Sequence, residues 1–165
     1  MRPSQITDWC HAIIRSQAAY GGFYIDATMG NGKDTLMLCT LAKETGSVLA
    51  FDIQDAALEA TQRLLEEQGC LGRAKLIRDG HEHMDLYAGE GTADVICFNF
   101  GYLPGGSHHI ATRASTSVEA IQKGLKILKK GGMMSLCLTA EGTRDLKKRR
   151  GSWTASENFR RGSIR

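Results

Sequence analysis

The stretch YIDATMGNGKDT, residues 24–35, most constrains the fold of this chain. A short apolar run ends at Asp26, the chain turns through Gly30, Asn31 and Gly32, and a segment with helical apolar periodicity begins at Asp34. This order predicts a strand, a glycine turn and a helix. Glycines permit a tight turn and let backbone N–H groups at a helix N-terminus approach a ligand closely. The stretch therefore predicts a nucleotide-type cofactor site.

The rest of the chain alternates between apolar strands and amphipathic helices. We predict helices at residues 5–19, 34–46, 55–68, 82–87 and 117–130, and strands at 23–26, 47–53, 75–78, 93–98 and 133–139. This alternation is typical of an α/β fold with a doubly wound, mainly parallel sheet and helices on both faces. Ligands of such sheets bind beyond the carboxyl ends of the strands. The polar residues expected at these ends are Asp26, Asp52, Asp79 and Asn99.

Charge divides the chain into two parts. Eight of the 21 Lys and Arg residues, but only two of the 18 Asp and Glu residues, lie in residues 144–165. This segment therefore carries +6 and residues 1–143 carry −3. We predict one cofactor-binding domain over residues 1–143 and a basic, atypical tail over 144–165. Overall basicity is no argument that the domain binds nucleic acid, because it comes from the tail.

The composition is that of an ordinary globular protein, with 42% apolar and 24% charged residues. No apolar run approaches the roughly 18 residues of a membrane span, and the first residues lack the apolar core of a secretory signal, so a cytoplasmic protein without membrane contact is expected. Five widely spaced cysteines without a CxxC motif predict reduced thiols. Two pairs of histidines have no carboxylate or Cys at ligand spacing, so no metal site is expected; they are His81 with His83 and His108 with His109.

Three cofactor classes compete for the glycine turn. In a phosphate-binding P-loop, Lys is followed by Ser or Thr, but Lys33 is followed by Asp34, and Ala27 replaces the first glycine. A dinucleotide fingerprint requires glycine where Thr35 stands. Asp26 and Asp34 would also repel a pyrophosphate. These patterns disfavour both phosphate-containing classes.

S-adenosylmethionine avoids this repulsion because it has no phosphate and its ammonium and sulfonium groups are cationic. Asp26 would attract the cationic methionyl end, directly or through water. Asp52 would accept the ribose hydroxyls, and Asp79 would accept the adenine amine, with His81 beside the site. Backbone of residues 30–32 would contact the ligand. The further candidate cofactor contacts are Thr28, Gly30, Asn31, Gly32, Asp34, Thr35, Ile53, Gln54 and Asn99.

Several segments resemble class I S-adenosylmethionine-dependent methyltransferases. DATMGNGKDT, FDIQ, DGH and NFGYLPGG, followed by TSVEAIQKGLKILKKGG, are more closely similar to the small bacterial putative rRNA methylase family, which includes a tRNA wobble-uridine methyltransferase. The resemblance covers roughly residues 5–140, and residues 99–106 are its most specific part. It implies methylation of the aminomethyl group on the wobble uridine of certain tRNAs. The implied partner is the tRNA anticodon region, and a homodimer is a further expectation.

The resemblance places the acceptor chemistry after the fourth predicted strand. Transfer to an amine requires a neutral nitrogen aimed at the methyl carbon, so alignment supplies much of the rate. Asn99 would hold the amine, and Asn99 and Tyr102 are the candidate catalytic residues. Phe100 and Tyr102 would either stack on a flipped base or pack against the cofactor. The candidate substrate-binding residues are Phe100, Gly101, Tyr102, Leu103, Pro104, His108 and His109, of which the two histidines would contact RNA phosphate or assist deprotonation.

The chain departs from the family pattern after the fifth predicted strand. Family members continue with a further helix and a final strand pair, whereas this chain reads EGTRDLKKRRGSWTASENFRRGSIR. One hypothesis is a basic arm that binds RNA phosphates. The other is a lost reading frame that leaves the sheet without its C-terminal strand pair, and the abrupt loss of periodicity favours it. A small-molecule amine methyltransferase and a non-catalytic cofactor-binding domain are the alternative functions.

Overall fold

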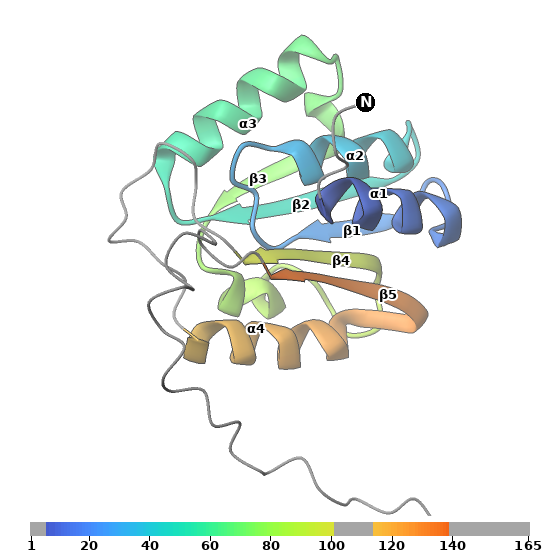
Figure 1. The fold of residues 1–165 in the computed structure, drawn as a ribbon, viewed down its shortest axis with the longest axis vertical. Helices are drawn as coiled ribbons and strands as arrows, with labels where there is room; N and C mark the ends of the chain where they lie inside the picture. The colour runs from blue at the N-terminus through green and yellow to red at the C-terminus, as the bar shows by residue number, and fades with distance from the viewer. Residues whose placement is uncertain (1–5, 101–113, 139–165) are drawn as a thin grey trace, which may run out of the picture.

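The computed structural model describes residues 6–100 and 114–138, which form one five-stranded sheet flanked by helices (Figure 1). The strands are β1 (Phe23–Asp26), β2 (Ser47–Asp52), β3 (Ala74–Arg78), β4 (Ala93–Phe100) and β5 (Leu128–Leu138). Their order is β3-β2-β1-β4-β5, and every neighbouring pair is parallel. The predicted doubly wound parallel sheet is therefore confirmed.

Helices cover both faces of the sheet (Figure 1). One face packs against α1 (Ile6–Gln17), α2 (Lys33–Ala42) and α3 (Asp55–Glu67), and the other packs against α4 (Ala114–Ile127) and the 3₁₀ helix η2 (His81–Leu86). A short 3₁₀ turn, η1 (Leu71–Arg73), precedes β3. Because side chains alternate along a strand, the sheet divides the interior into two apolar cores.

Strand β1 lies at the centre of the sheet, where strand order reverses. Its Tyr24 packs into the core under α1 to α3, and Ile25 packs into the core on the opposite face. The Tyr24 hydroxyl donates to the Ala19 carbonyl oxygen and accepts from the Gly22 N–H, which satisfies the polar end of a fully buried ring. Asp26 ends the strand between β2 and β4, opposite Cys97 of β4.

The predicted boundary between the last helix and the last strand is wrong. Helix α4 ends at Ile127 rather than at residue 130, and β5 begins at Leu128 rather than at residue 133. N–H groups of the loop before β4 bind the carbonyl oxygens of Lys126 and Ile127, which ends the helix. A register shift follows in β5, where Gly131 adopts φ 82°. Gly131 and Gly132 therefore lie in an irregular segment of the strand and do not end the helix.

Smaller corrections concern single boundaries. The helix predicted at residues 82–87 is the 3₁₀ helix η2, and β4 continues through Phe100, so Asn99 lies within the strand. Asp55 is the first residue of α3 and not its N-cap, which is Gln54.

All five cysteines are free, as expected. The predicted tail over residues 144–165 lies outside the described residues, and so does any C-terminal strand pair. No helix in the described part is long and apolar enough to span a bilayer.

The glycine turn gives a direct stability test at Gly32. This residue has φ 77°, and a Cβ there would lie 2.8 Å from Thr61 Oγ1 and 3.0 Å from Thr61 Cα. Gly69 has φ 64°, but nothing lies within 4 Å of its Cβ position. Both Gly→Ala substitutions incur the left-handed backbone cost of about 1–2 kcal/mol. Gly32→Ala should lose roughly 1–3 kcal/mol more free energy of unfolding in urea, because the added methyl group displaces Thr61. Equal losses would contradict this contact.

Candidate functional site

The carboxyl ends of β1 and β4 form the centre of the candidate site. The loop after β1 is joined to β4 by two hydrogen bonds: Ala27 N–H donates to the Cys97 carbonyl oxygen at 2.8 Å, and Asn99 N–H donates to Thr28 Oγ1 at 2.6 Å. These contacts place Thr28 beside Asn99 at the point where strand order reverses. The expectation that the strand ends converge is thus met for β1 and β4.

Asp26 is fully buried beneath the glycine turn. Its Oδ1 accepts the Thr28 N–H at 3.1 Å, and its Oδ2 accepts the Thr35 hydroxyl at 2.6 Å. Burial, and after it the nearby Asp34 carboxylate, raises the pKa of Asp26 to about 7, against the lowering effect of the two hydrogen bonds. Asp26 therefore fixes the turn to α2 and carries a charge that depends on its electrostatic surroundings.

The glycine turn is also held by β2 and α3. Gly30 N–H donates to Asp52 Oδ2 at 3.0 Å, and the Gly30 carbonyl oxygen accepts the Thr61 hydroxyl at 3.1 Å. Met29 N–H binds the Phe51 carbonyl oxygen at 2.8 Å. Thr61 was not among the predicted site residues, although a buried threonine on the inward face of a helix is a signal for a backbone contact.

Asp52 ends β2 and joins two turns. Besides Gly30, it accepts the Gln54 N–H at 3.0 Å, so each of its oxygens receives one backbone donor and keeps a second acceptor position. The adjacent Ile53 is 54% exposed, and Gln54 is half-buried. This corner presents carboxylate oxygens beside an apolar side chain, an arrangement that suits a ribose and a flat base.

Asp34 has a partner that the sequence did not reveal. Asp34 Oδ1 lies 2.5 Å from His11 Nε2, and both side chains are 15% exposed. The contact joins the first turn of α2 to α1, 23 residues earlier. Asn31, between the two glycines, is exposed.

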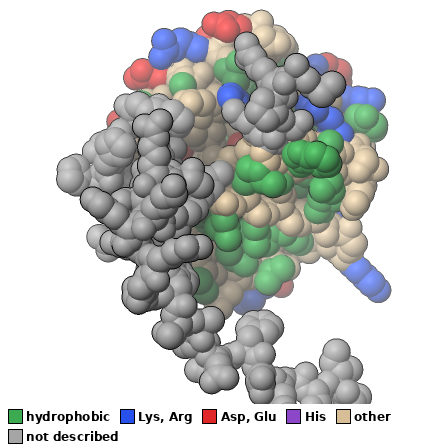
Figure 2. Space-filling model, in the orientation of Figure 1, with side chains coloured by type: hydrophobic (Ala, Val, Ile, Leu, Met, Phe, Trp, Pro, Cys, Tyr) green, Lys and Arg blue, Asp and Glu red, His purple; other side chains and the backbone are tan. Residues whose placement is uncertain are grey.

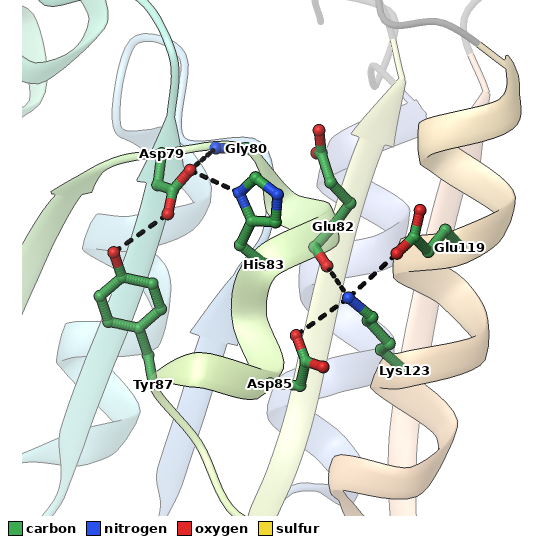
Figure 3. A network of polar contacts seen from close by, with 8 residues as sticks. All are labelled: Asp79, Gly80, Glu82, His83, Asp85, Tyr87, Glu119 and Lys123. Atoms are coloured by element: carbon green, nitrogen blue, oxygen red, sulfur yellow. Dashed lines mark hydrogen bonds and ion pairs between the residues drawn. The ribbon is translucent and has the colours of Figure 1, made fainter.

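Asp79 organises the segment after β3 (Figure 3). Its Oδ1 accepts the Gly80 N–H and contacts His83 Nδ1, both at 2.7 Å, and its Oδ2 accepts the Tyr87 hydroxyl at 3.0 Å. The His83 contact lowers the pKa of Asp79 and raises that of His83. Asp79 thus has three partners within its own segment, and an adenine amine would have to bind its remaining acceptor positions.

Lys123 of α4 holds η2 in place (Figure 3). Its Nζ donates to the Glu82 carbonyl oxygen at 2.6 Å and pairs with Asp85 at 3.1 Å and Glu119 at 3.0 Å. The contacts with Glu82 and Asp85 join α4 to η2, and the contact with Glu119 lies within α4. They fix the position of the segment that carries His81.

His81 lies between the site and the core. Its ring meets those of Phe98 and Phe100 edge-on, with centroids 6.0 Å apart in each case, and the two phenylalanines stack at 5.3 Å. Burial lowers the pKa of His81, so the imidazole is neutral at pH 7. Its Nε2 is buried and has no hydrogen-bond partner among the described residues. An unsatisfied buried nitrogen at this edge is consistent with a ligand contact.

Four aspartates give this edge of the sheet an acidic character that suits a cationic nucleoside better than a phosphate. They are Asp26, Asp34, Asp52 and Asp79. Among the described residues, no three His, Cys, Asp or Glu side chains converge as metal ligands do. The remaining predicted substrate residues lie outside the described residues and stay predictions; they are Gly101, Tyr102, Leu103, Pro104, His108 and His109.

Comparisons with known proteins agree with this geometry. Residues 48–146 match the family model described as "Putative rRNA methylase". The chain is 34% identical over 142 residues to the chloroplastic tRNA (mnm(5)s(2)U34)-methyltransferase of Arabidopsis thaliana, and the match covers 79% of this chain and 51% of that protein. The chain thus spans about half the length of this curated relative.

Two solved bacterial structures share both fold and sequence similarity with the chain. The "putative rRNA-methylase" of Clostridium thermocellum is 34% identical with a TM-score of 0.80, and the match covers 90% of this chain and 79% of that chain. A "putative methyltransferase" of Streptococcus mutans, solved with SAH, is 34% identical with a TM-score of 0.72, covering 81% and 72% of the two chains. The chain therefore belongs to the Putative rRNA methylase family and has the fold of the S-adenosylmethionine-dependent methyltransferases.

Proposed function

We propose that this chain transfers a methyl group from S-adenosylmethionine to a nitrogen of RNA, and that the acceptor is the aminomethyl group of the wobble uridine in tRNA. The observation that carries the proposal is the junction of β1 and β4, where Asn99 is bonded through its backbone to Thr28 of the loop above Asp26. A polar amide thus stands next to an acidic, glycine-lined cofactor edge.

The residues at this edge suit S-adenosylmethionine, which supplies an electrophilic methyl group on a cationic sulfonium. Gly30 and Gly32 carry no side chain that would shield the backbone of the turn from a ligand. Asp52 retains acceptor positions for ribose hydroxyls, and Ile53 exposes apolar surface for a base. Asp26 is fully buried, with one hydrogen bond to each oxygen, so it acts on the ligand through its charge and not by direct contact.

Asn99 is the residue best placed to orient an acceptor amine. Its backbone N–H is engaged by Thr28, while its half-buried side chain lies at the end of the strand that leads into residues 101–113. An amide oxygen can accept an N–H of a neutral amine and leave the nitrogen lone pair available for attack. His81, neutral and with an unsatisfied nitrogen, lies near the same strand end beside Phe98 and Phe100.

The choice of tRNA rests on family membership and on the named activity of the Arabidopsis relative. Charge does not favour it, because residues 1–143 carry −3. The two alternatives, a small-molecule amine methyltransferase and a non-catalytic cofactor-binding domain, make different predictions in one assay.

That assay combines the purified chain, labelled S-adenosylmethionine and tRNA carrying an aminomethyl group on its wobble uridine, with nucleoside mass spectrometry as the readout. We expect one methyl group to be added to this nucleoside and none to the same tRNA with unmodified uridine. Transfer to free aminomethyl nucleoside alone would indicate the small-molecule alternative. Cofactor binding without transfer to any amine would indicate the non-catalytic one.

Asn99→Ala should lower kcat roughly 100-fold, because the amine loses its orienting acceptor. The dissociation constant for S-adenosylmethionine should change little, since the backbone bond between residue 99 and Thr28 remains. Cys137→Ala is the matched control: Cys137 lies opposite Asn99 on β5, and its loss perturbs the strand pair without removing the amide. Turnover of Asn99→Ala near the wild-type rate would refute the assigned role.

The raised pKa of Asp26 predicts a pH dependence of stability without cofactor. The folded protein holds this proton up to about pH 7, whereas the unfolded chain releases it near the ordinary aspartate pKa of 3.8. The free energy of unfolding should therefore fall by roughly 1 kcal/mol per pH unit between about pH 5 and 7. Asp26→Asn should remove this slope in urea titrations, whereas substitution of the exposed Asp55 by Asn should keep it.

A bound cation favours the ionised form of Asp26, so binding of S-adenosylmethionine should release a proton below about pH 7 and its affinity should rise with pH. Calorimetry in buffers of different ionisation enthalpy measures this release. The same proton release in Asp26→Asn would assign it to another group.

A further inference from the structure

Helix α1 directs a histidine toward the carboxyl edge of the sheet. The outward flank of this helix carries the exposed Ile6, Trp9 and Ile13, and Figure 2 shows hydrophobic side chains gathered over this part of the molecule. His11 instead reaches across to Asp34 of α2, and 15% of each of these two side chains is exposed. The pair is therefore sheltered but still open to solvent.

The side chain of Asn99 lies on the same face of the sheet as α1 and α2. Side chains alternate along β4, where Cys97 belongs to the core beneath these helices and Phe98 belongs to the opposite core. By this alternation Asn99 shares the face of Cys97, and Phe100 shares the face of Phe98. His81, whose ring meets both phenylalanines, is therefore on the other face.

Two neighbours connect His11 to the site. On β5, Cys137 lies opposite Asn99, and its thiol contacts that of Cys10, the residue before His11. On α2, Asp34 lies in the first turn, directly after the glycine turn. Through these residues His11 adjoins both the strand end that carries the amide and the loop proposed to hold the cofactor.

The contact with Asp34 fixes how the His11 ring carries its protons. An ionised carboxylate only accepts hydrogen bonds, so Nε2 donates to Asp34 Oδ1 at 2.5 Å, and the lone pair of the neutral ring is on Nδ1. A carboxylate in this position also stabilises the imidazolium that forms when Nδ1 takes up a proton. The pair thus has the arrangement of a general base.

Methyl transfer to an amine requires a group of this kind. At neutral pH an alkylamine is largely protonated, and its nitrogen has no lone pair until that proton leaves. Each oxygen of Asp26 already accepts a hydrogen bond, and burial raises the pKa of the Cys97 and Cys137 thiols, so that they stay protonated. The free nitrogen of His81 is buried on the opposite face.

We propose that His11, held by Asp34, is the base that removes a proton from the acceptor amine. This inference rests on the proposed function and adds the residue that prepares its substrate. An N–H bond of the bound ammonium breaks, the proton goes to Nδ1 of His11, and the electron pair stays on the amine nitrogen. The imidazolium then gives the proton to solvent, to which the pair is open.

Glutamine at position 11 separates the base from the structural contact, because its amide can still donate to Asp34 but cannot take up a proton. It also leaves in place the other titratable or charged groups around His11. By element, these are Asp8, Cys10 and Arg15 on α1, Lys33 and Asp34 on α2, Asp26 on β1, Cys97 on β4 and Cys137 on β5.

The test measures single-turnover methyl transfer to aminomethyl tRNA as a function of pH. We expect His11→Gln to be roughly 100-fold slower than the wild type at pH 7. Its rate should then rise on the order of tenfold per pH unit toward the wild-type rate, as the amine loses its own proton. The melting temperature and the Kd for S-adenosylmethionine should stay near their wild-type values. His83→Gln is the matched control: His83 pairs with Asp79 at 2.7 Å, and its loss should leave the pH dependence of the rate as in the wild type.

Long-range proton–nitrogen NMR spectra of the imidazole rings give a readout without turnover. We expect the neutral His11 ring to carry its proton on Nε2 and to leave Nδ1 bare. A proton on Nδ1 and a bare Nε2 would overturn the inference, because Nδ1 then has no lone pair to offer.

A wild-type rate of His11→Gln at pH 7 also overturns the inference and leaves the proposed function standing. Loss of the neutral-pH rate in a His108→Gln, His109→Gln double variant would in that case assign the proton to those histidines. If the wild type transfers no methyl group to the amine at any pH, the proposed function fails and the inference fails with it.

Discussion

The burial of Asp26 is the constraint on which the candidate site depends. A carboxylate out of contact with water is costly unless hydrogen bonds compensate for the lost hydration, and Asp26 obtains them from Thr28 and Thr35 on the two sides of the glycine turn. The same bonds fix the path of the turn. Because burial and Asp34 raise the pKa of Asp26 to about 7, its carboxyl group is only partly ionised at neutral pH. A nearby cation favours the ionised form. The same group thus fixes the turn and, under the proposed function, favours a cationic ligand.

The turn is held by more than one strand, which explains how a short β1 can position it. Asp52 of β2 and Thr61 of α3 both bind Gly30, and Thr28 binds the backbone of Asn99 in β4. Each contact joins a different element to the same loop. A loop fixed in this way requires little reorganisation on binding, which favours the alignment that the proposed methyl transfer needs.

The sequence predicted those parts of the fold that depend on local pattern. Apolar periodicity located the strands, and parallel topology then brought Asp26 and Asn99 to one edge. Contacts between segments were not predictable: His11 meets Asp34 across 23 residues, and Lys123 reaches η2 from α4, without any periodic signal. The glycines at 131 and 132 read as a helix stop, yet capping by the loop before β4 ends α4 earlier. That outcome depends on tertiary hydrogen bonds that no local pattern records.

Helix α1 links the outside of the sheet to the charge at its carboxyl edge. One flank carries His11, which contacts Asp34 in the first turn of α2, and the opposite flank exposes Trp9. Only Ile14 of this helix is fully buried, so the helix owes little of its stability to the core of its own chain. The Asp34 carboxylate in turn raises the pKa of Asp26. The position of α1 therefore bears on the charge of the buried carboxyl group beneath the glycine turn.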